Sequence, residues 1–414
     1  MRKFDEISAW PWATLLWMGA ACSVVGMAIC LPVGWDLAVY RQAMKDLRDG
    51  LDPYLAGPAR LAGQDVTGSP HYFYLYPPIT LKFLQLANLV PSLAGRVLYW
   101  LVYAAGFGCQ LWAGYQLALP VERRILKFVM PVIVFFPGFM PNEVILCGNL
   151  AIPIYGAVLA ASVRGWQKNL WGWFYFAVLA GSLFKPPLLV LLAIPLLAGR
   201  AQILKSAAVG AFGVILFAAQ RFIWTKEFVE YLRIVKLESM LGNSAGHLWS
   251  FGFSAAGVLA STLRAMGKPY EGPGMGFFLA YSALLFAALV YLGWRYRRAL
   301  VQTCTWVTVL LLGTFLLSPR ILQYDALAVT VPMVLLTIRG WKDAVGRWIV
   351  IAGLGGSVVA LIANQDGVEI SLAMWSLLVA GMIGLHRESQ AGKVEAMQIP
   401  RRSHRASAAP NAAE

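Results

Sequence analysis

Apolar residues gather in long runs along this chain, and short polar connectors separate the runs. Most runs hold roughly 16 to 24 residues, the length that an α-helix needs to cross a hydrocarbon core of about 30 Å. A membrane β-barrel would instead show short segments of alternating polarity. The pattern predicts an all-α, polytopic membrane protein with about twelve spans, over residues 10–33, 94–118, 125–141, 147–163, 168–183, 184–199, 203–222, 274–294, 300–317, 321–338, 346–363 and 370–385.

The first loop predicted outside the membrane, residues 34–93, contains two shorter apolar patterns. The run 79–90 is enclosed by prolines and would reach only about 18 Å as a helix, which is too short to cross the membrane. Residues 37–47 place apolar side chains at helical spacing opposite a basic face. We expect both segments to form interfacial helices on the outer side.

Basic residues are distributed unevenly between the two sides of these spans. The short connectors on one side carry thirteen Lys or Arg residues and those on the other side carry two. Cytoplasmic connectors are enriched in Lys and Arg, so the richer side is predicted to be cytoplasmic, together with both termini. Membrane orientation thus explains the formal net charge of +14 without a nucleic-acid partner. The thirteen residues are Arg123, Arg124, Lys127, Arg164, Lys168, Arg200, Lys205, Arg295, Arg297, Arg298, Arg339, Lys342 and Arg347.

This topology also sets the domain organisation. Residues 1–385 form one predicted membrane domain with outer loops 34–93 and 223–273. Residues 386–414 lack apolar periodicity and are predicted to be a disordered cytoplasmic tail. Within the second outer loop, residues 247–267 have an apolar centre, so we expect a re-entrant or interfacial segment there.

Composition narrows the classes of function. Hydrophobic residues make up 59% of the chain and charged residues 13%, which excludes a water-soluble domain. No acidic residue falls near the midpoint of a predicted span, which argues against a proton- or sodium-coupled transporter. The five cysteines show no metal-ligand spacing, and no nucleotide-binding motif has a supporting context. We therefore expect the chemistry at the outer surface.

Asp36 is the first acidic residue after the first predicted span and lies close to the membrane plane. Two roles fit this position. The side chain can cap the N-terminus of the helix that follows. Alternatively, it acts as a general base that takes a proton from an acceptor hydroxyl during sugar transfer.

Lys185 and Arg320 are the two basic residues of the short outer connectors, and each adjoins a proline. One interpretation is that they snorkel to the interface or contact lipid headgroups. The other is that both bind a phosphate, Arg through its planar fork and Lys as a point charge. A pair of cations at the outer leaflet suits an anionic lipid ligand.

Aromatic and histidine side chains add further candidates. His247 and Trp249 lie in the second outer loop, where a lone His is more often a packed, hydrogen-bonded residue than a catalyst. The aromatic residues of segment 72–76 precede two prolines. They form either an interfacial aromatic belt or a platform for a sugar ring or prenyl chain.

Six short motifs occur in order on the predicted outer side: Asp36-Leu-Ala-Val-Tyr40, Gly50-Leu-Asp52-Pro53-Tyr54, Tyr74-Leu-Tyr76-Pro77-Pro78, Gly148-Asn149, Lys185-Pro186 and Ser318-Pro319. Together they resemble the GT-C glycosyltransferases of family 87. That family includes the polyprenol-phosphate-mannose-dependent mannosyltransferases of bacterial envelopes. The resemblance extends over about residues 10–340.

The resemblance implies a GT-C-type enzyme in the bacterial inner (plasma) membrane, with an active site that faces outward. Its reaction would move one sugar, mannose or another hexose or pentose, from a polyprenyl-phosphate donor to a glycolipid or glycan, with inversion and Asp36 as base. Lys185 and Arg320 would steady the departing phosphate, so we expect no cofactor and no metal. The expected substrate-binding residues are Tyr40, Asp52, Tyr54, Tyr76, Asn149, His247, Trp249, Tyr324 and Asp325.

Several alternatives stay open at this point. Asn149 stands where the family often has Gln, and segment 323–325 where mycobacterial members carry histidines, which leaves the sugar and the acceptor open. Asp325 either forms an ion pair with Arg320, one turn away, or closes a helix surface. A transporter or flippase of a lipid-linked saccharide would share the spans but need no base. A surface-polysaccharide polymerase or ligase would share the outward site and use a pyrophosphate-lipid donor.

Overall fold

The computed structural model describes residues 9–30, 34–55, 74–87, 89, 92–131, 145–196, 198–244, 254–268, 273–300, 304–363 and 368–390. Every secondary-structure element in these ranges is a helix, and no strand occurs in them. The predicted all-α class is therefore confirmed. In chain order the elements are α1 (Ala9–Cys30), α2 (Trp35–Arg48), α4 (Pro78–Ala87), α5 (Ser92–Leu117), α6 (Pro120–Met130), α7 (Ala151–Lys168), α8 (Gly172–Phe184), η3 (Pro186–Leu192), α9 (Ala193–Leu196), α10 (Arg200–Ile223), α11 (Thr225–Ser244), α12 (Ala255–Ala265), α13 (Pro273–Leu300), α14 (Cys304–Leu316), α15 (Gln323–Ala326), η5 (Leu327–Val329), α16 (Thr330–Gly340), α17 (Ala344–Ile362) and α18 (Val368–Gln390).

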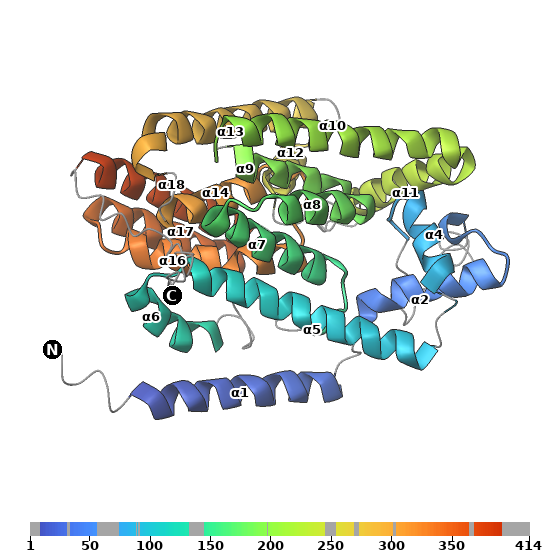
Figure 1. Cartoon of the computed structure of the whole chain (residues 1–414), viewed down its shortest axis with the longest axis horizontal. Helices are drawn as coiled ribbons and strands as arrows, with labels where there is room; N and C mark the ends of the chain where they lie inside the picture. The colour runs from blue at the N-terminus through green and yellow to red at the C-terminus, as the bar shows by residue number, and fades with distance from the viewer. Residues whose placement is uncertain are drawn as a thin grey trace, which may run out of the picture.

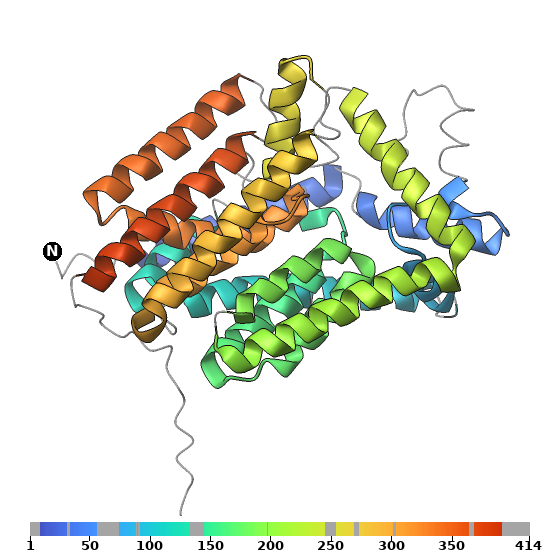
Figure 2. The same cartoon turned by 90° about the horizontal axis from the view of Figure 1, so that it is seen from above.

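The long helices run mostly along the longest axis of the molecule, and α2 and α4 gather at one end of it (Figure 1). Helix α1 lies along one side of this bundle. Seen from above, α17 and α18 lie side by side at an edge away from α10 (Figure 2). All thirteen residues of α14 are buried, so this helix occupies the middle of the bundle.

Four helices are long and apolar enough to cross a membrane: Ala201–Ile223, Gly274–Arg295, Ala344–Ile362 and Val368–Arg387. Shorter apolar helices occur at Trp12–Gly26, Gly172–Phe184, Pro186–Pro195 and Cys304–Leu316. Large apolar side chains point outward from the long helices; Phe222 is 82% exposed and Ile362 is 80% exposed. Such faces are suited to lipid, because hydrocarbon rather than water solvates them. The protein is thus a helical membrane protein, and the count of twelve spans stays a prediction.

Two of the predicted spans are interrupted helices. The span 184–199 consists of the 3₁₀-helix η3 followed by the single turn α9, and the span 321–338 consists of α15, η5 and α16. Prolines account for the first interruption, because each removes a backbone donor and restricts the preceding residue. Both interrupted segments begin beside residues that the sequence singled out, Lys185 and Arg320.

Two predicted boundaries differ from the structure. The second outer loop, predicted as 223–273, begins with α11, a regular 20-residue helix that the sequence analysis did not predict. The predicted segment 247–267 lies partly outside the described residues, and its described part forms α12. Helix α18 continues to Gln390, beyond the predicted start of the tail at residue 386.

The outer-loop helices pack on a shared aromatic core. We call this set the outer core; its buried members are Val39, Tyr40, Ala43, Tyr54, Tyr74, Leu81, Phe228, Tyr231 and Ile234. Helices α2 and α4 therefore exist as predicted, but the apolar face of α2 packs against protein. Its amphipathic pattern therefore reflects this packing, and a place at the membrane surface stays a prediction.

A buried ion pair joins α6 and α16 at the opposite end of the bundle. Both oxygens of the Glu122 carboxylate accept hydrogen bonds from the Arg339 guanidinium, at 2.9 and 2.8 Å. Arg339 also donates to the Thr308 hydroxyl at 3.0 Å and to the Leu117 carbonyl at 2.9 Å. A buried pair that is this completely hydrogen-bonded fixes the relative positions of the helices that supply it.

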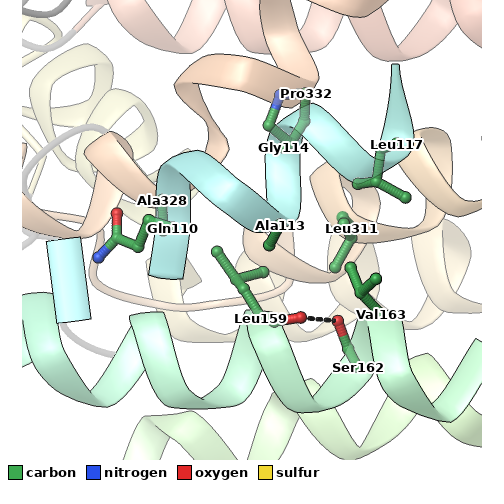
Figure 3. Close-up of a pocket in the computed structure, with 10 residues that line it drawn as sticks. All are labelled: Gln110, Ala113, Gly114, Leu117, Leu159, Ser162, Val163, Leu311, Ala328 and Pro332. Carbon is green, nitrogen blue, oxygen red and sulfur yellow. Dashed lines mark hydrogen bonds between the residues drawn. The ribbon is translucent and has the colours of Figure 1, made fainter. Parts of the chain in front are cut away.

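A small cavity lies inside the bundle (Figure 3). Its volume is about 10 Å³, which is room for about one water molecule. Residues of α5, α7, α14, η5 and α16 line it, among them Gln110, whose side-chain oxygen is buried without a hydrogen-bond partner. The cavity is too small for a sugar or a lipid, and none of the predicted site residues lines it.

Candidate active site

Asp36 lies in the first turn of α2, and its carboxylate is held by a residue distant in the sequence. Its backbone N–H donates to the Cys147 carbonyl at 2.9 Å, and its Oδ2 accepts a hydrogen bond from the Asn149 side-chain amide. The N-cap residue of α2 is Gly34, with no side-chain capping bond. The N-cap interpretation of Asp36 is therefore wrong, because its carboxylate bonds to a different segment of the chain.

Two glycines allow this close approach. Gly34 and Gly148 have φ angles of 74° and 73°, in the left-handed region that favours glycine. A Cβ atom at residue 148 would lie 3.1 Å from the Leu37 Cβ and 3.3 Å from the Gly34 Cα. The Gly34 N–H donates to the Leu146 carbonyl at 2.7 Å. The start of α2 and the segment before α7 are thus joined through backbone contacts that leave no room for larger side chains.

Lys185 lies in the break between α8 and η3 and pairs with Asp325. The distance from Lys185 Nζ to Asp325 Oδ1 is 3.1 Å, and the two side chains are 17% and 6% exposed. The ammonium also lies 4.2 Å from the centroid of the Tyr324 ring, a cation–π geometry. Asp325 Oδ2 accepts the Leu322 N–H at 3.0 Å, so this carboxylate also caps α15.

The sequence analysis considered an ion pair between Arg320 and Asp325 as one of two roles for Asp325, and in the structure Asp325 pairs with Lys185. Arg320 lies in the turn between α14 and α15. The Ser318 hydroxyl donates to the Arg320 carbonyl at 2.8 Å, and the Ser254 hydroxyl before α12 donates to the Pro319 carbonyl at 2.7 Å. Helices α12, α14 and α15 therefore all contribute to the position of this turn.

The charges of Lys185, Arg320 and Asp325 all act on Asp36, so the four groups form one electrostatic cluster. Burial raises the pKa of the Asp36 carboxyl above its ordinary value of 3.8. The hydrogen bond from Asn149 and the positive charges of Lys185 and Arg320 lower that pKa, and the negative charge of Asp325 raises it. A buried carboxylate with a raised pKa beside two cations is an arrangement typical of functional sites.

Two tyrosines, Tyr40 and Tyr76, lie close enough to Asp36 for its charge to act on them. The Tyr40 hydroxyl donates to the Tyr76 hydroxyl, and their ring centroids are 5.0 Å apart. Burial raises the pKa of both phenols, so they are neutral near pH 7. The Tyr54 hydroxyl donates to the Tyr76 carbonyl at 2.7 Å and is thereby used within the outer core. Asp52 accepts the Tyr54 N–H at 3.0 Å, a local turn contact.

The structure thus brings together most of the residues predicted to form the site. Asp36 bonds to Asn149, Tyr40 bonds to Tyr76, and Lys185 contacts both Tyr324 and Asp325. The charges of Lys185, Arg320 and Asp325 act on Asp36. Tyr54 and Asp52 support the neighbouring outer core. His247 and Trp249 lie outside the described residues.

Two further residues belong to this region and were not predicted. The Tyr99 hydroxyl, on α5, donates to the Gly148 carbonyl and so supports the segment that carries Asn149. Tyr231, on α11, packs in the outer core, and its pKa, raised to about 12 by burial, is lowered in part by the charge of Arg320. The helical spacing of Phe228, Tyr231 and Ile234 was the sequence signal for α11.

Among the described residues, no group of three or more His, Cys, Asp or Glu side chains could hold a metal ion. Comparison with known proteins gives no relative from which a function could be transferred: no family model, curated protein or solved structure matches the chain. The chemistry must therefore be argued from the cluster around Asp36 itself.

Proposed function

We propose that this protein is a membrane glycosyltransferase of GT-C type that transfers one sugar from a polyprenyl-phosphate donor to a glycolipid or glycan on the extracytoplasmic side. The observation that carries the proposal is the cluster itself: one carboxylate, Asp36, within electrostatic range of two cations, Lys185 and Arg320. These three residues come from α2, from the break before η3 and from the turn before α15. The resemblance of the six motifs to family 87 indicates which reaction to expect from Asp36, Lys185 and Arg320.

In the proposed reaction, Asp36 accepts the proton of an acceptor hydroxyl while that oxygen forms a bond to the anomeric carbon of the donor sugar. The bond between the anomeric carbon and the phosphate oxygen breaks, and polyprenyl phosphate leaves. A phosphodiester with one negative charge becomes a monoester with up to two. Lys185 and Arg320 stabilise this added charge, the Arg by its planar donors and the Lys as a point charge. Attack opposite the leaving group inverts the anomeric configuration.

The surroundings of Asp36 suit a base. Asp36 must be ionised to accept a proton, and the Asn149 bond and the two cations favour the ionised form. Burial acts in the other direction and keeps the pKa above that of a free Asp, which makes the carboxylate more basic. A transporter or flippase of the same lipid would have no need for a carboxylate in this position.

The proposal is tested by incubating the purified protein with radiolabelled polyprenyl-phosphate sugars, mannose first and then other hexoses and pentoses, in the presence of extracted envelope lipids. We expect transfer of label to an acceptor and release of polyprenyl phosphate by the wild-type protein. If no donor of this class is consumed, but a labelled lipid-linked saccharide crosses the bilayer of reconstituted vesicles, the protein is a flippase. Consumption of pyrophosphate-linked donors alone would favour the polymerase or ligase.

A further inference from the structure

Asn149 lies two residues before the start of α7 and is 1% exposed. Both ends of its side-chain amide are used inside the protein. Oδ1 accepts the Ala151 N–H at 2.7 Å, and Nδ2 donates to Asp36 Oδ2. Because a backbone N–H can only donate, the bond to Ala151 fixes which end of the amide is oxygen. The amide nitrogen is therefore directed at Asp36.

The backbone around Asn149 is held just as firmly. The Asn149 N–H contacts the Cys147 sulfur at 3.3 Å, and the Tyr99 hydroxyl donates to the Gly148 carbonyl. The Asp36 N–H donates to the Cys147 carbonyl at 2.9 Å. Segment 147–149 is thus bonded to Asp36 twice, once through the backbone of Cys147 and once through the side chain of Asn149.

We infer that Asn149 is a positioning residue for Asp36, which holds the carboxylate by Oδ2 and leaves Oδ1 as the oxygen that receives the acceptor proton. The role of Oδ1 as base rests on the proposed function. The hydrogen bond from Asn149 to Oδ2 is a feature of the structure and does not depend on the proposed function. Among the described residues, no second hydrogen bond to the Asp36 carboxylate occurs, so Oδ1 is the oxygen open to a substrate hydroxyl.

This assignment differs from the substrate-binding role expected from the sequence. A substrate contact needs an amide group directed away from the protein, whereas the amide of Asn149 bonds inward at both ends. A hydrogen bond donated to a carboxylate favours its charged form, so removal of the donor should raise the pKa of Asp36. A raised pKa of Asp36 would show that the Asn149 bond to the carboxylate is lost, which a loss of folding stability alone would not produce.

Other charged or titratable groups also face Asp36, and they stay in place in the test. They are Lys185 before η3, Arg320 before α15, Tyr324 and Asp325 on α15, Tyr40 on α2, Tyr76 before α4, Tyr99 on α5 and Cys147 before α7. Because none of them is changed, a shift can be assigned to the lost Asn149 bond.

The test variant is Asn149→Ser. Serine can still accept the N–H of Ala151, two residues further on, as Ser hydroxyls do in turns, but it is too short to reach Asp36. The titration of Asp36 is followed in lipid nanodiscs by infrared difference spectroscopy, as the spectrum of each protein minus that of its Asp36→Asn counterpart. We expect the midpoint to move to higher pH by about one unit, the size expected for a lost hydrogen bond to a charged group. An unmoved or lowered midpoint overturns the inference.

A matched control is Ser162→Ala on the same helix, which removes a buried hydroxyl whose bond goes to the Leu159 carbonyl. We expect its Asp36 midpoint to equal that of the wild type, and an equal shift in this control would also overturn the inference. Transfer assays on the same proteins separate the two proposals. Loss of transfer in Asp36→Asn with an unchanged midpoint in Asn149→Ser would reject the positioning role alone. A shifted midpoint without any sugar transfer by the wild type would reject the proposed function alone.

Discussion

Four charged side chains determine the electrostatics of the site: Asp36 and Asp325 are negative when ionised, and Lys185 and Arg320 are positive. With two negative and two positive groups the set is close to electrically neutral, and Asp325 is paired with Lys185. A donor phosphate adds negative charge to this balanced set, and the leaving group adds more as the sugar departs. Donor binding should therefore depend on both cations.

Substitution of either cation by glutamine tests this dependence. Lys185→Gln and Arg320→Gln should each weaken the binding of polyprenyl phosphate, used without a sugar, by roughly 10- to 100-fold, the cost of losing a charge-assisted hydrogen bond. Binding is measured by titration calorimetry in detergent. Lys82→Gln is the control, because Lys82 pairs at 3.6 Å with Glu227 on α11 and does not act on Asp36. Unchanged affinity in both cation variants would refute their phosphate role.

At the level of helices, α5 and α7 cross in close contact through glycine. A Cβ atom at Gly156 would collide with the Gly106 backbone, and one at Gly106 would lie 2.9 Å from the Pro153 Cβ and closer still to the Pro153 backbone. Small residues at such crossings are typical of membrane helices, because they let backbones approach. Helix α5 carries Tyr99 and α7 follows Asn149, so this crossing also fixes the position of these two residues relative to each other.

Two glycines on α5 should respond to alanine in opposite ways. Gly106→Ala should lower the stability by about 1 to 3 kcal/mol, because the added methyl overpacks a backbone contact. Gly108 has nothing within 4 Å of an added Cβ, so Gly108→Ala should be neutral or stabilising by up to about 1 kcal/mol. Thermal unfolding of the two variants in one detergent measures the difference. A Gly106→Ala protein as stable as the wild type would show that the helices do not cross so closely.

Periodicity predicted those helices whose apolar pattern is regular, and it failed where packing or proline changes the backbone. Helices α2 and α4 were predicted because Leu37, Tyr40 and Met44 recur at helical spacing and because Pro78 begins the next run. The breaks after Lys185 and before α16 were not predicted. At the first break, hydropathy does not register the loss of a backbone donor at Pro186 and Pro187. The second break, at η5, contains no proline and has no signal in the apolar pattern.

At the scale of the whole molecule, the candidate site was predicted only as a set of residues on one side of the membrane. The topology placed Asp36, Lys185 and Arg320 on that side, and the structure brings them within electrostatic range. The partners of these residues could not be predicted. Asn149 is 113 residues from Asp36 and Asp325 is 140 residues from Lys185, so their contacts depend on how the helices pack.

The sidedness of the molecule is a further prediction at this scale. The Arg339–Glu122 pair and the cluster around Asp36 lie at opposite ends of the segment α15–α16, which suits opposite sides of a membrane. In a cysteine-free background, Arg48→Cys on the exposed face of α2 should react with an impermeant maleimide on intact spheroplasts. Arg124→Cys on α6 should react only after lysis. The reverse pattern would place the site in the cytoplasm and contradict the proposed donor geometry.

The most direct test compares turnover and donor binding in the Asp36→Asn protein. Asparagine has nearly the same shape as aspartate but cannot accept the proton, so sugar transfer should fall by roughly 10² to 10⁴-fold. The affinity for polyprenyl phosphate should change little, because the proposed phosphate ligands are Lys185 and Arg320. Transfer at the wild-type rate would contradict the role of Asp36 as the base, and loss of binding together with transfer would make it a binding residue instead.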